Sequence, residues 1–198
     1  MKKTILVFAG VLGVVAGSIL VLIFDFDFKW AFPEKQASSA EQVQWERYTT
    51  DEGHCTFLLP GKTEMRKGLR QEGDHPVTVN WWRVEPPNLP ATFNFTFWVI
   101  LDADKDPEKL LDRAIAALVE GDKSKQLVAN RIELQRVPGR EVIFERQDQH
   151  GSYYQLSRVY LRRRGQLRLY QTNVRTRMKE DLYAGYTRKF LDSLTFVE

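Results

Sequence analysis

The chain has 198 residues, with 29 lysines and arginines against 26 acids and a net charge of +3. This length suits one domain with an appendage, and the near-neutral charge gives no general attraction for nucleic acid. Because 43% of the residues are hydrophobic, a packed core is expected rather than global disorder. The single cysteine, Cys55, excludes an intramolecular disulfide, and its apolar neighbours predict a buried, unreactive thiol.

The N-terminal segment Ile5 to Phe24 contains twenty consecutive residues without a charge. As a helix it would be about 30 Å long, which is the thickness of a bilayer's hydrocarbon core. Lys2 and Lys3 precede it, which predicts a cytoplasmic N-terminus and a C-terminal part outside the cytoplasm. We therefore expect residues 1–32 to form a single-pass membrane anchor that ends in a belt of aromatic residues. The alternative is a signal peptide cleaved near Val15–Ser18, which would make the protein secreted.

Residues 33–44 are small and polar, and we interpret them as a linker to a domain at residues 45–198. From residue 45 on, a short strand before a turn at 51–53 and a second strand at 55–59 are predicted. Residues 76–86 and 92–101 alternate in hydrophobicity with a period of two, which predicts two longer strands. In the second of these, Trp98 and Ile100 lie opposite the phenylalanines, so a helix or a partner must cover that face as well.

The segment from Asp106 to Gly121 is the strongest predicted helix, with Asp106 as its cap and Pro107 in its first turn. Further along, strands are predicted at 130–135 and 140–146 around a turn at 136–139. A hairpin follows, with strands at 153–161 and 166–174 and its turn at 162–165. A second amphipathic helix over about 179–193 and a final edge strand close the chain. This order of elements predicts an α+β sandwich built on one antiparallel sheet.

Motifs for catalysis or metal binding are not evident. Asp102, Asp104 and Asp106 alternate as in a calcium loop, but Pro107 and Arg113 stand where that loop needs glycine and glutamate. The three histidines are scattered, and the sequence contains no phosphate-binding glycine loop and no nucleophile elbow. We therefore expect no enzyme activity, no metal and no cofactor.

Seven arginines and no acid occur in residues 158–177, the predicted hairpin. Arginine forks bind phosphate and carboxylate groups, so one hypothesis is an anion- or partner-binding site. The residues of this site would be Arg162, Arg163, Arg164 and Arg168. The other interpretation is a solvated hairpin whose arginines pair with acids of the preceding strand, namely Glu141, Glu145 and Asp148. A second candidate for partner binding is an aromatic face around Trp82 and Trp98.

Three stretches of the domain resemble PsbP-like domains, which occur in photosystem extrinsic proteins, import factors and bacterial envelope proteins. These are "ERYTTDEGHCTFLLPGK" at 46–62, "RVPGREVIFE" at 136–145, and "RLYQTNV" with "KFLDSLTF" near the end of the chain. The resemblance implies an antiparallel sheet flanked by helices on both faces, an α/β/α sandwich, over residues 45–198. It implies no activity, and the family's metal or subunit contacts match no residues here.

These observations together predict a membrane-tethered, non-catalytic binding or assembly module of the cell envelope. Its expected partner is another envelope protein or lipid head groups, and not nucleic acid. The alternative is an anion-binding module that uses the arginine-rich hairpin.

Overall fold

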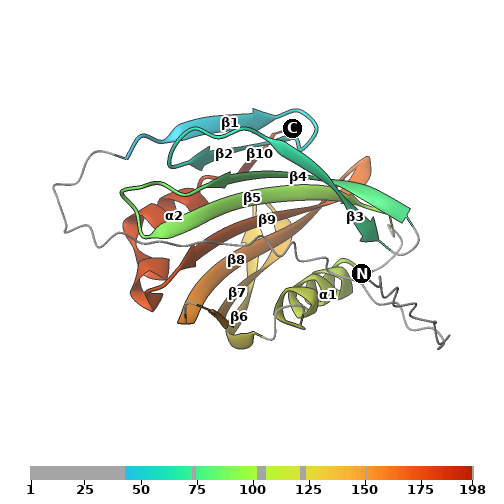
Figure 1. Cartoon of the computed structure of the whole chain (residues 1–198). Helices are drawn as coiled ribbons and strands as arrows, with labels where there is room; N and C mark the ends of the chain where they lie inside the picture. The colour runs from blue at the N-terminus through green and yellow to red at the C-terminus, as the bar shows by residue number, and fades with distance from the viewer. Residues whose placement is uncertain (1–42, 73–74, 102–105, 121–123, 150, 198) are drawn as a thin grey trace, which may run out of the picture.

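The computed structural model describes residues 43–72, 75–101, 106–120, 124–149 and 151–197, which form a mostly β structure of two antiparallel sheets with two α-helices (Figure 1). The larger sheet has seven strands in the order β3-β4-β5-β9-β8-β7-β6. Their bounds are β3 Arg66–Glu72, β4 His75–Val84, β5 Ala91–Ile100, β6 Lys125–Leu134, β7 Val137–Asp148, β8 Gly151–Arg164 and β9 Gln166–Thr176. Consecutive strands are neighbours except at β5–β9, where the chain crosses through α1 and three further strands.

The smaller sheet joins the two ends of the domain. Its order is β1-β2-β10, with β1 at Glu46–Thr50, β2 at Cys55–Leu59 and β10 at Thr195–Phe196. The strand predicted before the turn at 51–53 and the strand predicted at 55–59 are therefore confirmed, and the last strand pairs with β2.

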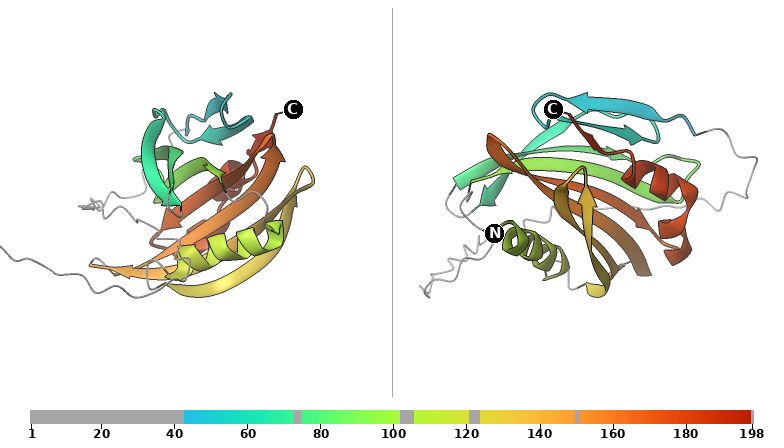
Figure 2. Two further views of the ribbon diagram at one scale, coloured as in Figure 1. Left: turned by 90° about the vertical axis from the view of Figure 1, so that its right-hand side faces the viewer. Right: turned by 180° about the vertical axis from the view of Figure 1, so that it is seen from behind.

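One face of the large sheet packs against α1, which spans Pro107–Glu120. Asp106 caps this helix through a 3.0 Å hydrogen bond that its side chain accepts from the backbone N–H of Glu108, as expected. The buried Arg140 of β7 fixes the helix, because its guanidinium donates to Glu108 at 2.6 Å and to Asp112 at 2.9 Å. Figure 2 shows α1 and the small sheet on opposite sides of the large sheet. The predicted cover over Trp98 and Ile100 is this helix.

The other face packs against the small sheet, a 3₁₀ turn η1 at Lys179–Tyr183 and the short helix α2 at Gly185–Leu191. Aromatic rings fill this core, and Phe57, Phe93, Phe95 and Phe190 are almost completely buried. The expected α/β/α sandwich with helices on both faces is thus corrected. On this side a second sheet provides much of the cover, because the alternating strands β1 and β2 direct Cys55, Phe57 and Leu59 inward.

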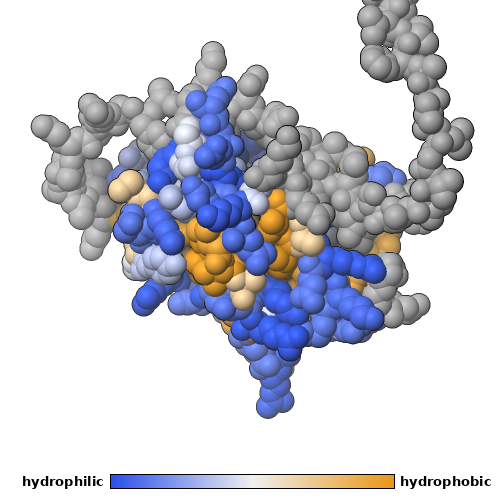
Figure 3. Space-filling model, turned by 90° about the horizontal axis from the view of Figure 1, so that it is seen from below, coloured by the Kyte–Doolittle hydropathy of each residue, from blue (hydrophilic) through white to orange (hydrophobic). Residues whose placement is uncertain are grey.

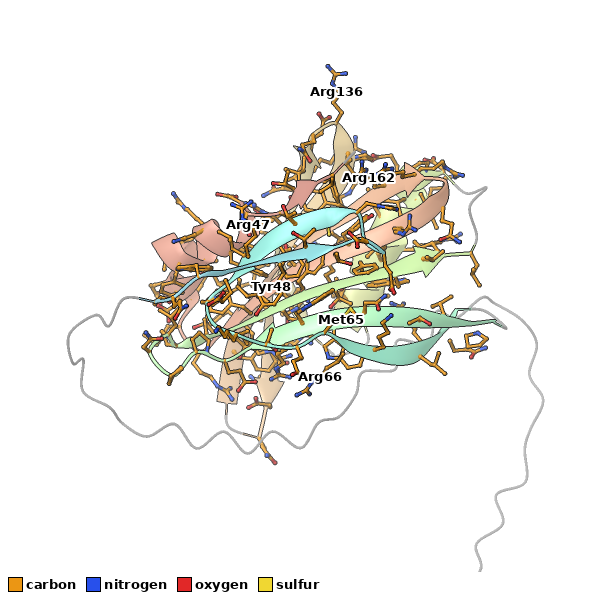
Figure 4. All side chains as sticks on the ribbon, turned by 90° about the horizontal axis from the view of Figure 1, so that it is seen from above. Arg47, Tyr48, Met65, Arg66, Arg136 and Arg162 are labelled. Atoms are coloured by element: carbon orange, nitrogen blue, oxygen red, sulfur yellow. The ribbon has the colours of Figure 1, made fainter. Side chains whose placement is uncertain are left out.

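Three local predictions also need correction. The helix predicted over 179–193 is two separate turns, because Ala184 adopts an extended backbone (φ −64°, ψ 156°) between them. The turn predicted at 136–139 lies instead at Gln135 and Arg136, whose φ angles are 50° and 65°. Arg136 projects from the tip of the β6–β7 hairpin (Figure 4). Strand β3 was not predicted.

The predicted anchor, Ile5 to Phe24, lies outside the described residues, as do the linker before residue 43 and two of the three aspartates at 102–106. Within the described ranges no helix has the length and apolarity to cross a membrane.

Candidate functional site

The predicted arginine site is divided between the two faces of the large sheet. Arg162 lies opposite Arg168 in the β8–β9 register, so both side chains share the face that packs on the small sheet. Arg164 shares this face as well. Arg163 pairs with Leu167, a residue of the core beneath α1, and therefore projects to the other side. The hairpin brings three of the four predicted arginines together and separates the fourth.

Arg162 and Arg164 are largely occupied by backbone carbonyls at the end of the chain. Arg162 donates to the carbonyl of Val197 at 3.1 Å and to that of His54 at 3.2 Å, and its guanidinium lies 5.0 Å from the ring centre of Phe196. Arg164 donates to the same Val197 carbonyl at 3.0 Å. These contacts fix β10 in place, so the two arginines have a structural role in closing the small sheet.

Pairing with acids, the other interpretation of the hairpin, is found at two arginines nearer its base. Arg158 donates to Glu141 at 2.8 Å and to Asp192 at 2.6 Å. Arg177 binds both carboxylate oxygens of Asp148, at 3.1 and 2.8 Å. Most of the hairpin's charge at this end is therefore compensated within the domain.

The aromatic face predicted around Trp82 and Trp98 does not exist as one surface. Trp82 is 4% exposed and packs among the phenylalanines beneath the small sheet, whereas Trp98 is 7% exposed and packs beneath α1. Trp82 is the register partner of Phe95, which lies three residues before Trp98 on β5. Because successive side chains of a strand alternate between its faces, Trp82 and Trp98 lie on opposite faces of the sheet.

A cavity of about 70 Å³ lies between α1 and the large sheet. Its walls are mostly apolar, and three polar side chains, Arg70, Arg113 and Gln171, complete them. The apolar lining comprises Trp98, Ile100, Leu110, Ala114, Ala117, Leu118, Val159 and Leu169. Arg70 of the edge strand β3 stacks on Trp98, with 4.8 Å from its guanidinium carbon to the ring centre. Figure 3 shows apolar side chains exposed among polar ones on this underside of the molecule.

A band of polar side chains continues from this cavity across the same face of the sheet. We call it the polar row, and it comprises Thr92, Asn94, Gln155, Ser157, Asn173 and Arg175, which are register partners or alternate neighbours on β5, β8 and β9. Gln155 donates to Ser157 at 3.0 Å, and Ser157 donates to the Asn173 side-chain oxygen at 2.7 Å. Gln171, which lines the cavity, donates to the same oxygen at 2.8 Å. A hydrogen-bonded network therefore connects the apolar cavity with the polar row.

Arginines gather at the polar row. Burial lowers the pKa of Arg83, and the positive charges of Arg175 and Arg66 lower it further, against the effect of Glu85. Burial also lowers the pKa of Arg146 to about 10, with Arg175 again contributing. The guanidiniums of Arg83, Arg146 and Arg175 are therefore close enough to repel one another. Because their surroundings are partly shielded from water, a bound anion would be stabilised there.

Known structures resemble this arrangement of strands and helices. No protein-family model matches the chain, and neither does any curated protein in a sequence comparison. The solution structure of cyanobacterial PsbP from Synechocystis sp. PCC 6803 is 11% identical, matches 83% of this chain and 99% of its own, and gives a TM-score of 0.51. The chain has a PsbP-like fold. LpqN of Mycobacterium tuberculosis, described as involved in cell envelope biogenesis, is 16% identical over 79% of this chain and 92% of its own, with a TM-score of 0.50.

The single cysteine of the chain lies within the core. Cys55 is fully buried, and burial raises the pKa of its thiol to about 12, which agrees with the predicted unreactive cysteine. Within the part of the chain that the structure describes, no three His, Cys, Asp or Glu side chains converge as metal ligands would.

Sequence reasoning missed the α1-face site, meaning the cavity and the polar row together. Its residues come from four strands and one helix, and their meeting follows only from the crossover between β5 and β9. One signal was available. Asn94, Ser157 and Asn173 are short polar residues at the centres of long strands, where apolar or β-branched residues are usual.

Proposed function

We propose that the chain is a membrane-tethered, non-catalytic binding module of the cell envelope, with its PsbP-like domain outside the cytoplasm. The uncharged segment Ile5 to Phe24 and the two lysines before it support the tether and its orientation. The observation that carries the binding role is the α1-face site. An apolar cavity beside a small number of oriented polar groups is the usual composition of a ligand site.

Two neighbouring alanines of α1 provide the test. Ala117 lines the cavity, whereas Ala116 is exposed and does not line it. An Ala117→Trp substitution fills the cavity, and Ala116→Trp adds the same ring on the outside. Full-length protein of each kind is incubated with a solubilised envelope extract, recovered, and analysed for bound molecules by mass spectrometry.

We expect the unmodified protein and the Ala116→Trp variant to retain a component that the Ala117→Trp variant loses. Thermal unfolding and circular dichroism of the three proteins verify that the Ala117→Trp variant is folded. If the folded Ala117→Trp variant retains everything that the unmodified protein retains, the binding function does not reside at the α1 face.

A second candidate is anion binding at the hairpin tip, and one observation favours it. The charges of Arg164, Arg168 and Arg162 lower the pKa of His54, after the larger effect of burial, so the field at this tip is positive. An Arg163→Gln, Arg168→Gln double variant leaves the contacts of Arg162 and Arg164 with Val197 intact. This candidate is supported if the double variant sediments less with phosphatidylglycerol vesicles than the unmodified protein does, and if added salt reduces that difference. Unchanged sedimentation would eliminate it.

A further inference from the structure

We propose that the α1-face site binds a small amphiphile, with its anionic head group on the polar row and its apolar end in the cavity. The inference rests on the proposed binding function and adds the chemistry of the ligand. The anionic group is a phosphate, sulfate or carboxylate, since these are the groups that arginine forks and amide N–H groups bind.

The positive charge comes from Arg175, which is unlike its neighbours in the same strand region. Arg158 and Arg177 each pair with carboxylates of the domain. Arg175, which lies between them in sequence, contacts the ring of Tyr153 at 4.4 Å and forms no ion pair with a carboxylate among the described residues. The domain thus provides counter-ions for arginines with a structural role and leaves the charge of Arg175 available at the polar row.

Hydrogen-bond donors converge beside this charge. The Asn173 side-chain oxygen accepts from both Ser157 and Gln171, which orients its NH₂ group away from them. That NH₂ group donates to no group within the described ranges, and Asn173 is partly exposed. Arg175 lies two residues further along β9 on the same face, about 7 Å away.

Arg83 approaches the same point from another strand. It is the register partner of Asn94, which is in turn the partner of Asn173, so Arg83 lies two strand spacings, or about 10 Å, from Asn173. An arginine side chain can extend over most of that distance. An anion above Asn173 would therefore receive an amide donor from below and the guanidinium of Arg175, while Arg83, which is paired with Glu85 at 2.6 Å, adds positive charge nearby.

The apolar end of the ligand follows from the position of Gln171. This residue lies two positions before Asn173 on the same face and is also part of the cavity wall. An anion at Asn173 is thus about 7 Å from the cavity entrance. A cavity of about 70 Å³ accommodates the end of a short alkyl group but not a long chain, because a cavity of about 150 Å³ takes a benzene molecule.

The test uses hexyl phosphate as the amphiphile, with inorganic phosphate and hexyl glucoside as probes for each half of the ligand alone. Binding is measured by isothermal titration to the full-length protein in nanodiscs, and empty nanodiscs are subtracted. The variants are Arg175→Gln, Ala117→Trp and, as a charge-matched control, Arg47→Gln. Arg47 is exposed on β1 of the small sheet, remote from α1 (Figure 4).

We expect hexyl phosphate to bind more tightly than either partial probe. Arg175→Gln should weaken it about tenfold or more, and Arg47→Gln less than about twofold. Ala117→Trp should weaken hexyl phosphate but not inorganic phosphate. Arg175→Gln should leave thermal stability unchanged or higher, because it removes repulsion from Arg83 and Arg146, whereas the loss of a structural arginine would lower it.

Equal affinity of the Arg175→Gln variant and the unmodified protein for hexyl phosphate overturns the head-group assignment. If the unmodified protein binds inorganic phosphate as tightly as hexyl phosphate, the cavity does not bind the alkyl end. If it binds hexyl glucoside as tightly as hexyl phosphate, the polar row does not select an anionic head group. If no hexyl phosphate binds while the Ala117→Trp variant still loses an envelope component, this inference fails and the proposed binding function stands. If neither effect is seen, both fail.

Discussion

Arg158 shows how one arginine of the hairpin stabilises the domain. Its side chain is 21% exposed and donates to Glu141 of β7 and to Asp192 after α2, so it joins the sheet to the C-terminal helix. Replacing Arg158 with alanine leaves two carboxylates without their partner. We expect a loss of about 1–3 kcal/mol in the free energy of unfolding, measured by urea denaturation.

The control for this substitution is Arg163→Ala at the exposed hairpin tip, for which we expect a change of at most about 0.5 kcal/mol. An equal loss in the two variants would mean that the ion pairs of Arg158 do not contribute to stability.

Two buried weak acids, the thiol of Cys55 and the phenol of Tyr170, make the free energy of unfolding depend on pH in the alkaline range. Burial raises the pKa of Cys55 and of Tyr170 to about 12, from ordinary values of 9.0 and 10.0. Both groups ionise more readily in the unfolded chain, so their contribution to stability is complete below about pH 9 and is lost as the pH rises toward 12. We expect the free energy of unfolding to fall by about 2 kcal/mol between about pH 8 and 10.5, measured in urea.

A Cys55→Ala variant tests the source of this pH dependence, because it removes the contribution of Cys55 and retains those of the tyrosines whose pKa burial raises, Tyr160, Tyr170 and Tyr186. Its free energy of unfolding should decrease less over the same interval, whatever the substitution costs at neutral pH. A decrease as large as that of the unmodified protein would assign the pH dependence to other groups.

At the level of the single residue, the sequence indicated which side chains are unusual but not what they do. The excess of arginine at 158–177 is evident from composition. The hydrogen bond that Arg162 donates to the Val197 carbonyl, in contrast, depends on where β10 ends. The carboxylate that pairs with a given arginine also depends on register. Glu141 and Asp148 were correctly expected to pair with hairpin arginines, since they lie on the adjacent strand.

Strand β7 depends on a glycine at its contact with β8. A Cβ atom on Gly139 would lie 2.6 Å from the ring of Tyr160 and 2.7 Å from the backbone oxygen of Val159. The backbone cannot move away without disturbing the β7–β8 ladder. We expect Gly139→Ala to lower the free energy of unfolding by about 1–3 kcal/mol, measured by urea denaturation.

Gly185→Ala is the matched control, because a Cβ atom at this first residue of α2 would meet nothing within 4 Å. Alanine there should be neutral or stabilise the protein by up to about 1 kcal/mol. A Gly139→Ala variant as stable as Gly185→Ala would contradict the role assigned to the close approach.

The elements with strong periodicity were predictable, and those with weak periodicity were not. β4, β5, β8 and β9 alternate, and α1 has both a cap and an apolar face, so local sequence specifies them. β3 reads "RKGLRQE", a polar stretch that is extended only because β4 offers it a partner along its length. The helix predicted over 179–193 is interrupted at Ala184, whose backbone is extended. The side chain of Thr187 donates to the backbone oxygen of Asp181 at 2.7 Å, which links η1 to α2.

The candidate site was beyond sequence reasoning for a topological reason. Arg83, Asn94 and Asn173 come from three different strands, and their alignment requires the register of both β4–β5 and β5–β9. The β5–β9 pair joins segments separated by three intervening strands and α1. No local pattern specifies such a long-range pairing.

At the scale of the whole molecule, the tether determines where the domain acts. We predict that the full-length protein sediments with membranes and that deletion of residues 1–32 moves the domain into the soluble fraction. Fractionation followed by immunoblotting measures this. A periplasmic reporter enzyme fused after Val197 should be active, since we place the domain outside the cytoplasm. Equal membrane association of both forms would show that the domain, and not the anchor, contacts the membrane.

The pairing of β2 with β10 also has a consequence for biosynthesis. Phe196 packs on Tyr170 and Tyr160, and the backbone N–H of Val197 donates to the His54 carbonyl at 2.9 Å. A nascent chain therefore cannot complete its small sheet until Thr195 and Phe196 have left the ribosome. Until then β2 presents an open edge and its apolar side chains to the surroundings, a state prone to aggregation. The domain should thus depend on a holding chaperone during synthesis or export, and a chain that stops short of Thr195 should be degraded rather than accumulate.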